Sequence, residues 1–343
     1  MSMAPETSSP LLPPELERVV FELAAENDAR TTRSLMLVAT RVRIWIEPLM
    51  YRLIYLDTGD LHAFRGLISE NPTLGLHVQH LFLDLWTMRS DSPAGIALIA
   101  ACPNVTNLAL WTFMDTTTPI PLPLLPKLSR LSTDIGFLTF NQTGAALSAH
   151  LEPIRSLTHL DITNVGWTMS QAIEGVKEIR RARALPSLTH LALGKASSVA
   201  PYMDILRMAS QLQVLCMYVQ QPEDPHSSWE ERIPDPRFCV VTVVNKPFSA
   251  DWRIGAEGGR GLWQRAEERV AERRKKLARS PLLDNPLRPL PIIFTAPRSP
   301  HPIILEVFKL KNYQPLVPQP LHRLLLHMPP HRVLTVLNED QHL

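Results

Sequence analysis

Few cysteines, few glycines and no long apolar run are present in this 343-residue sequence, and each shortage excludes a class of structure. Three scattered cysteines are too few for a fold that is held together by disulfide bonds, and none belongs to a Cys/His cluster with zinc-site spacing. No run reaches the roughly 18 apolar residues that a membrane-spanning helix needs. The polar first ten residues lack the layout of a signal peptide, so we expect a cytoplasmic or nuclear protein that is not secreted.

An excess of charge of one sign is also lacking. The 35 Lys and Arg against 33 Asp and Glu leave a net charge of +2, which gives no reason to expect binding to nucleic acid or to a membrane. The sequence has no nucleophile elbow, no phosphate-binding loop that ends in Gly-Lys-Ser/Thr and no His-Glu-x-x-His helix. We therefore predict no enzyme activity, no cofactor and no metal. The glycine-rich run at 255–261 is interpreted as a flexible turn.

Proline is abundant instead, with 32 residues against 13 glycines. Twelve of these prolines lie in residues 281–343, which contain no glycine and show no repeat spacing. This composition predicts a disordered tail over residues 280–343. Other prolines fall between predicted helices and strands, where proline stops a helix. They include Pro103, Pro126, Pro153 and Pro186.

A short pattern, apolar-x-x-apolar-x-apolar, recurs through the middle of the chain. Leu157–Ile162 and Leu188–Leu193 are two clear copies, and both contain Leu-Thr-His-Leu. Successive copies are 23 to 31 residues apart, with a mean of about 27, which is typical of leucine-rich repeats. The central apolar positions form one column: Ile54, Leu81, Leu108, Leu131, Leu160, Leu191, Leu215 and Val241.

Each copy is predicted to form a strand, and the segments between copies read as amphipathic helices. These helical segments are 92–101, 143–151, 170–184 and 200–209. One strand and one helix cannot bury their own apolar faces, but stacked copies can. We predict an α/β leucine-rich-repeat solenoid over residues 51–248, with parallel strands and helices on the convex side, followed by a charged helical cap over residues 249–279. An ordinary α/β domain with coincidental spacing is the alternative.

The residues that alternate with the inward leucines should face the concave side of the solenoid, where a protein ligand would bind. Aligned strands would place Asp84, Trp111 and Asp134 side by side as a peptide-contact patch. His159 and His190 occupy equivalent positions on neighbouring strands, but two ligands do not complete a metal site. The predicted substrate-binding residues are Asp84, Trp111, Asp134, His159, Asp161, His190 and Tyr218. A sheet face with scattered polar residues is the alternative interpretation.

Before the repeats, residues 11–50 read as a small bundle of short helices, after a disordered stretch at 1–10. Pro14 suits the first turn of a helix, and Glu15 favours its positive end. Apolar residues then recur at helical spacing, and a polar link separates them from a second apolar segment that ends near Pro48. A bundle of about 40 residues is marginally stable alone, so it should dock on the first repeat, on a partner, or on both.

The same residues resemble an F-box. Leu12–Leu16 reads Leu-Pro-Pro-Glu-Leu, and Phe21 follows. Val38-Ala39 with Arg41-Val42 and Trp45 resembles the later Val-x-(Arg/Lys)-x-Trp segment of that family. Followed by irregular leucine-rich repeats, residues 11–245 are similar to F-box/leucine-rich-repeat proteins. The divergent sets of mushroom-type fungi are especially similar, because the run Arg-Val-Arg-x-Trp-x-Glu-Pro-Leu-x-Tyr-Arg recurs there and is matched by residues 41–52.

The resemblance implies an adaptor role. The F-box would bind the Skp-type linker of a cullin–RING ubiquitin ligase, and the repeats would hold an unidentified protein substrate, with the chain as a monomer within the complex. The linker-contact residues that it implies are Leu12, Pro13, Leu16, Val20 and Phe21. The alternative is a ligase-independent repeat scaffold in which the N-terminal helices only cap the solenoid.

Overall fold

The structure is a computed structural model of the whole chain, and it describes the chain in eight segments. These are residues 12–26, 29–85, 92–112, 122–139, 142–163, 169–219, 228–243 and 248–279. The predicted disordered stretches at 1–10 and 280–343 lie outside the described residues. Among the residues that the structure does describe, no helix is long and apolar enough to cross a membrane.

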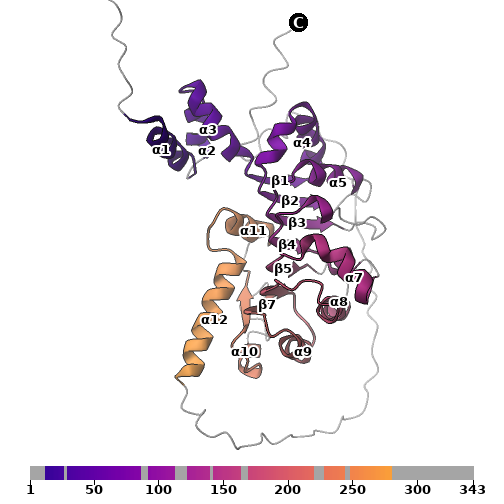
Figure 1. Cartoon of the computed structure of the whole chain (residues 1–343). Coiled ribbons are helices and arrows are strands. Elements are labelled where there is room, and N and C mark those ends of the chain that lie inside the picture. Colours follow the sequence, from indigo (N-terminus) through magenta and orange to yellow (C-terminus); the bar gives the residue numbers. More distant parts are fainter. Residues whose placement is uncertain are drawn as a thin grey trace, which may run out of the picture. The chain divides into compact units, whose positions relative to one another are not determined.

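A parallel sheet of eight strands forms the centre of the described chain, and each strand pairs with the next one in the sequence (Figure 1). The strands are β1 Leu53–Asp57, β2 His80–Leu85, β3 Asn107–Thr112, β4 Arg130–Thr133, β5 His159–Ile162, β6 His190–Leu193, β7 Val214–Val219 and β8 Phe238–Thr242. The prediction of an α/β fold with parallel strands is confirmed at this level. Sequential pairing is also the order that stacked strand–helix units produce.

The predicted column sets the register over seven strands. Leu81 lies opposite Leu108, and Leu160 lies opposite Leu191. Val241, the eighth residue of the predicted column, is wrong, because Leu215 pairs with Phe238 and not with Val241. A displacement of three residues along a strand turns the side chain to the other face. Phe238 is fully buried in the main core, whereas Val241 packs on the opposite face of the sheet.

Helices pack against one face of the sheet and complete the main core. They are α4 Thr58–Glu70, α5 Ser92–Ala101, α6 Ile135–Thr139, α7 Gly144–Leu151, α8 Met169–Arg181, α9 Ala200–Met208 and α10 Trp229–Arg232, with 3₁₀ turns η1 Pro72–His77, η3 Leu122–Leu124 and η4 Glu152–Ile154. Leu98, Val176 and Ile205 from these helices are buried with the strand leucines. The core is therefore continuous from one strand–helix unit to the next.

The N-terminal head consists of α1 Pro14–Glu26, α2 Ala29–Met36 and α3 Thr40–Tyr51. Val42 and Ile46 of α3 are buried in a small core that is separate from the main one. Phe21 packs against Trp45 with 6.5 Å between ring centroids. The end of α3 leads directly into β1, and Tyr51 packs against the main core, so α3 joins the head to the sheet.

The C-terminal described segment forms two helices, α11 Phe248–Ala256 and α12 Leu262–Ala278. They lie on the face of the sheet that α4–α10 leave uncovered (Figure 1). The glycine-rich run joins them in a tight turn, where Gly258 has φ +81. A Cβ on Gly261 would stand 2.7 Å from the Cα of Gly255, so glycine is required where the two helices approach each other.

Candidate functional site

Helices α11 and α12 cover the strand face that was predicted to be open. Trp252 of α11 packs edge-on against Phe82, with 5.1 Å between ring centroids, and Phe82 is fully buried. Further along the sheet, Leu262 and Val270 of α12 are buried against Cys216 and its neighbours. The expectation of an exposed concave surface is therefore wrong. The physical reason is that Phe82, Cys216 and others in the outward positions are apolar and need a cover of their own.

A cavity of about 420 Å³ lies between this strand face and the covering helices. Its floor comes from strands β3, β4 and β5, and its other walls come from α11, the glycine-rich turn and the start of α12. The lining residues are Asn107, Arg130, Leu131, Ser132, Asp161, Asp251, Trp252, Gly255, Gly258, Gly259, Gly261, Leu262, Trp263, Gln264 and Glu267. The cavity thus joins the polar part of the strand face to the helices that cover it.

A hydrogen-bonded chain crosses three strands at the floor of this cavity. Trp111 Nε1 donates to Ser132 Oγ over 3.1 Å, and Ser132 Oγ donates to Asp161 Oδ2 over 2.7 Å. The strand register explains the arrangement, because Ser132 and Asp161 are direct partners on β4 and β5. The chain fixes the Asp161 carboxyl group in place beneath the cavity.

Burial raises the pKa of Asp161 to about 7, and the negative charge of Asp251 adds to this increase. The hydrogen bond from Ser132 lowers the pKa, but its effect is smaller than that of burial. Asp251 of α11 is itself buried and pairs with Arg265 Nη2 over 2.5 Å. Arg265 also donates to the carbonyl oxygen of Thr242 over 2.7 Å, which ties α12 to the end of β8. Among the described residues, no hydrogen-bond partner reaches Asp161 Oδ1 or Asp251 Oδ2.

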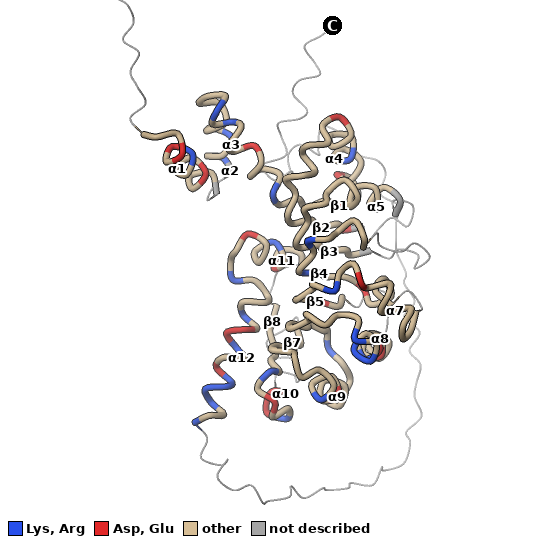
Figure 2. Tube along the Cα trace, in the orientation of Figure 1, with Lys and Arg blue, Asp and Glu red and all other residues tan. Residues whose placement is uncertain are grey.

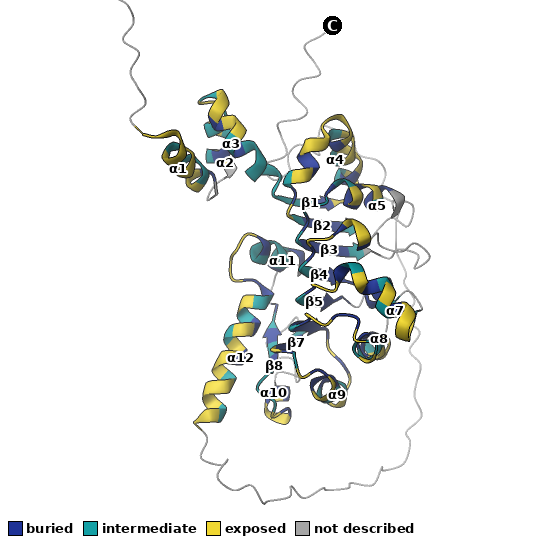
Figure 3. Cartoon of the chain, viewed as in Figure 1, coloured by how far each residue is buried: buried dark blue, intermediate teal, exposed yellow. Residues whose placement is uncertain are grey.

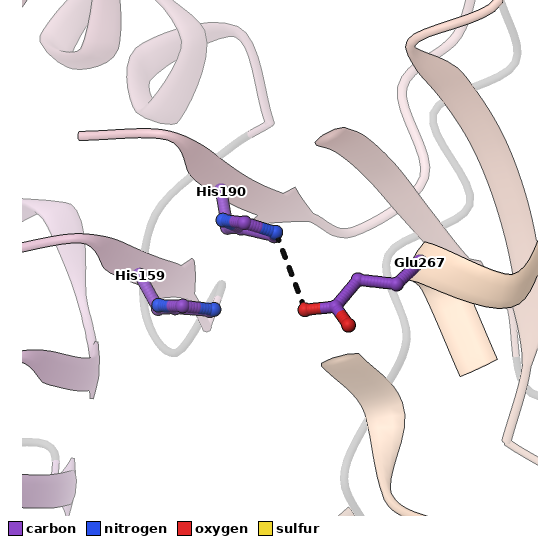
Figure 4. A group of neighbouring side chains, drawn as sticks. All are labelled: His159, His190 and Glu267. Atoms are coloured by element: carbon purple, nitrogen blue, oxygen red, sulfur yellow. Dashed lines mark ion pairs between the residues drawn. The ribbon is translucent and has the colours of Figure 1, made fainter. Parts of the chain in front are cut away.

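Beside the cavity, three side chains that can bind a metal ion come together (Figure 4). The rings of His159 and His190 stack with 4.1 Å between centroids, and Trp263 of α12 packs edge-on against both. Glu267 Oε1 lies 3.4 Å from His190 Nε2. Burial lowers the pKa of His159 to about 3 and that of His190 to about 4, and Arg130 contributes to both shifts. Both imidazoles are therefore neutral at pH 7.

The other predicted substrate-binding residues do not form one patch. Asp84 and Trp111 are register partners on β2 and β3, and Asp84 accepts a hydrogen bond from Tyr55 over 3.4 Å. Asp134 is buried instead, where its Oδ1 accepts the Gly136 backbone N–H over 2.8 Å at the start of α6. Tyr218 is half-buried and donates its hydroxyl to the carbonyl oxygen of Ile162 over 3.0 Å.

A second candidate surface lies on the head. Leu12, Pro13, Leu16 and Val20 are exposed, as the linker-contact prediction requires of them. Phe21 is half-buried against Trp45, so most of its ring contributes to the head's own core. Further apolar residues of the head are exposed, and Figure 3 shows exposed stretches on all three helices. These residues are Val19 and Leu23 on α1, Leu37 and Val38 after α2, and Ile44 on α3.

Every site residue that the C-terminal helices contribute was missed at the level of sequence. Asp251, Trp252, Trp263 and Glu267 were interpreted as parts of a cap beyond the last repeat, so no partner on the strands was sought for them. The available signal was the pair of tryptophans on either side of the glycine-rich turn. Tryptophans are seldom left in solvent, and together with an apolar strand face they indicate a segment that folds back.

No family model matches the sequence, and no curated protein is similar enough to match it.

Proposed function

We propose that this chain is a non-catalytic substrate-recognition adaptor of a Skp–cullin–F-box ubiquitin ligase. In this proposal the α1–α3 head is an F-box that binds the Skp-type linker, and the strand–helix units are irregular leucine-rich repeats that hold a protein substrate. The sequential parallel sheet and its spacing of about 27 residues support the repeat assignment. The exposed apolar side chains of α1 in the head support the linker assignment.

The observation that carries the proposal is the apolar surface of α1. Leu16, Val19, Val20 and Leu23 recur at helical spacing, and each is about half exposed, between 49% and 56%. Monomeric proteins seldom leave such side chains together in water unless a partner covers them. The F-box resemblance assigns linker contact to Leu16 and Val20 of this same surface. The Skp-type linker is therefore the occupant that we propose for it.

The separate core of the head favours docking to a partner over simple capping. A cap normally shares the core of the array that it covers, whereas Val42 and Ile46 are buried among head residues. The head contacts the array through α3, and α1 turns Phe21 and Ala25 toward the head core. The exposed side of α1 is therefore left for another molecule.

At the substrate end, the cavity beneath α11 and α12 replaces the open strand face as the proposed contact region. Its wall combines Trp252 and Trp263 with the polar floor of β3–β5. Aromatic side chains beside hydrogen-bonding groups are typical anchors of protein interfaces. We propose that a polar segment of the substrate inserts there.

The direct test is binding of the purified full-length chain to a purified Skp-type linker, measured by size-exclusion chromatography and calorimetry. The variants Leu16→Asp and Val20→Asp place a charge on the exposed α1 surface and should reduce affinity at least tenfold without unfolding the head. Leu124→Asp is the matched control, because Leu124 is 43% exposed but lies in η3 of the array. It should bind as the unmodified chain does.

Absence of binding by the unmodified chain at micromolar concentrations would refute the ligase role. Equal loss of binding in all three variants would show that the effect is not located on α1. If deletion of residues 1–48 collapsed the thermal transition of the remainder, the head would act as a cap, and the scaffold alternative would replace the adaptor.

A further inference from the structure

We propose that His159, His190 and Glu267 form a binding site for a divalent transition-metal ion of the zinc class, which joins α12 to strands β5 and β6. The ligand atoms of the three side chains lie within 4.8 Å of one another (Figure 4). Two histidines and one carboxylate are a ligand set that zinc commonly uses with water in the fourth position. The set is assembled from two strands and from a helix more than 70 residues further along the chain.

The spacing is close to that of a metal centre. Bonds of about 2.0–2.1 Å in a tetrahedral site place neighbouring ligand atoms about 3.4 Å apart. Glu267 Oε1 and His190 Nε2 are already separated by 3.4 Å. The two imidazole rings are nearly parallel, with 11° between their planes, so His159 must turn toward Glu267 to direct its lone pair at the same point.

The hydrogen bonds at the opposite side of each ring suit metal binding. Thr158 Oγ1 lies 2.8 Å from His159 Nδ1, and Thr189 Oγ1 lies 2.8 Å from His190 Nδ1. Each threonine hydroxyl also donates to a backbone carbonyl, that of Ser129 or of Thr158. When the hydroxyl hydrogens point to those carbonyls, each Nδ1–H donates to its threonine, and the lone pairs lie on the Nε2 atoms. Such outer contacts orient ligating histidines in metalloproteins.

An unpartnered nitrogen gives independent support. His159 Nε2 is buried and has no hydrogen-bond partner among the described residues. Buried polar atoms are nearly always paired, so an orphan of this kind needs an explanation. A metal ion between His159 and Glu267 would supply the missing partner. Glu267 and Trp263 also line the cavity, from which water can reach the fourth position.

One nearby charge opposes the ion. The Arg130 guanidinium belongs to the same cavity wall and acts electrostatically on both histidines. Its repulsion should weaken binding without changing the ligand set. Imidazole ligands select Zn²⁺, Co²⁺, Ni²⁺ or Cu²⁺ over Mg²⁺ and Ca²⁺, which prefer oxygen ligands alone.

The experiment titrates the full-length chain, first treated with EDTA, with ZnCl₂ and separately with CoCl₂. We expect one ion per chain, visible absorption bands of four-coordinate Co²⁺, and a higher melting temperature with Zn²⁺ than with EDTA. His159→Ala, His190→Ala and Glu267→Gln should each weaken binding at least tenfold. Arg130→Gln should tighten it.

Two variants serve as matched controls. Glu272→Gln removes an exposed carboxylate from the same helix, and His62→Ala removes an exposed imidazole from α4. Both should bind as the unmodified chain does. The proposal is overturned if no stoichiometric binding occurs, if binding survives loss of both histidines, or if Glu267→Gln and Glu272→Gln weaken it equally. Melting in EDTA shows whether each variant is folded, and none of these measurements requires the linker.

Discussion

Replacing Glu230 with alanine should destabilise the protein by about 3 kcal/mol, because Glu230 anchors α12 to the end of the sheet. Its buried carboxylate accepts the Val240 backbone N–H over 2.8 Å and pairs with Arg269 through bonds of 2.8 to 3.1 Å. Arg273 lies 3.5 Å from the same carboxylate and donates to the carbonyl oxygens of Glu230 and Ile233. One side chain therefore holds β8 and two turns of α12.

The magnitude follows from what the alanine leaves behind. The Val240 N–H loses its acceptor in a partly buried position, which costs about 1–3 kcal/mol. Arg269 is 49% exposed, so water screens its ion pair, which contributes about 1 kcal/mol at most. Arg273 is 12% exposed but keeps its two carbonyl acceptors. Its contribution to the change is therefore small, and the sum stays near 3 kcal/mol.

Urea unfolding followed by tryptophan fluorescence measures the change. Glu230→Gln is the informative control, since its amide oxygen can still accept the Val240 N–H and it should cost only about 1 kcal/mol. Arg269→Ala should cost no more than Glu230→Gln, because the Arg269 side chain is half exposed. A loss below 1 kcal/mol in Glu230→Ala, or equal losses in the alanine and glutamine variants, would refute this account of how α12 is held.

Three further results are expected. Gly75→Ala should destabilise the protein by about 1–3 kcal/mol in thermal unfolding, because the new Cβ would stand 2.1 Å from the Ala101 carbonyl oxygen. Gly66→Ala is the control, since its new Cβ would meet nothing within 4 Å and the change should be neutral or slightly stabilising. Burial lowers the pKa of His80 from 6.5 to about 4, so the unfolded chain binds a proton at a higher pH than the folded chain does. The free energy of unfolding should therefore decrease as the pH drops from 6.5 toward 4, and it should decrease less in His80→Gln. The three cysteines are buried, so a thiol reagent should label them only after unfolding; fast labelling of the native chain would contradict the buried positions.

The strand register could be predicted from the sequence because each repeat fixes it locally. The central leucine of each strand must face the helices, and side chains along a strand alternate between the two faces of the sheet. The position of the leucine therefore determines which face each other strand residue occupies, and aligning the repeats is enough to pair His159 with His190. The rule failed at the last strand, where the leucine is replaced by phenylalanine. A pattern search for aliphatic residues there selects Val241, although Phe238 fills the larger inward volume.

The position of α12 could not be predicted in the same way. Its charges suggested a solvated helix, and Lys and Arg do gather along it (Figure 2). However, Ala266 and Val270 form a narrow apolar stripe that is buried on the sheet. Arg273 from the basic run also turns inward to backbone carbonyls. Periodicity reports one apolar face per helix, but it does not say which of several apolar surfaces that face covers.

The way α12 is attached limits how a substrate could bind in the adaptor proposal. Its later turns seal Val214, Cys216 and Cys239 and hold Glu230, so removing them would expose apolar strand surface and break a buried ion pair. This cost makes α12 part of the fold. Its first turns are held as well, because Leu262 and Ala266 are buried on the sheet and Arg265 pairs with Asp251 and donates to the Thr242 carbonyl oxygen. In the adaptor proposal a substrate should therefore reach the strand face through the cavity beside the glycine-rich turn, without displacement of α12.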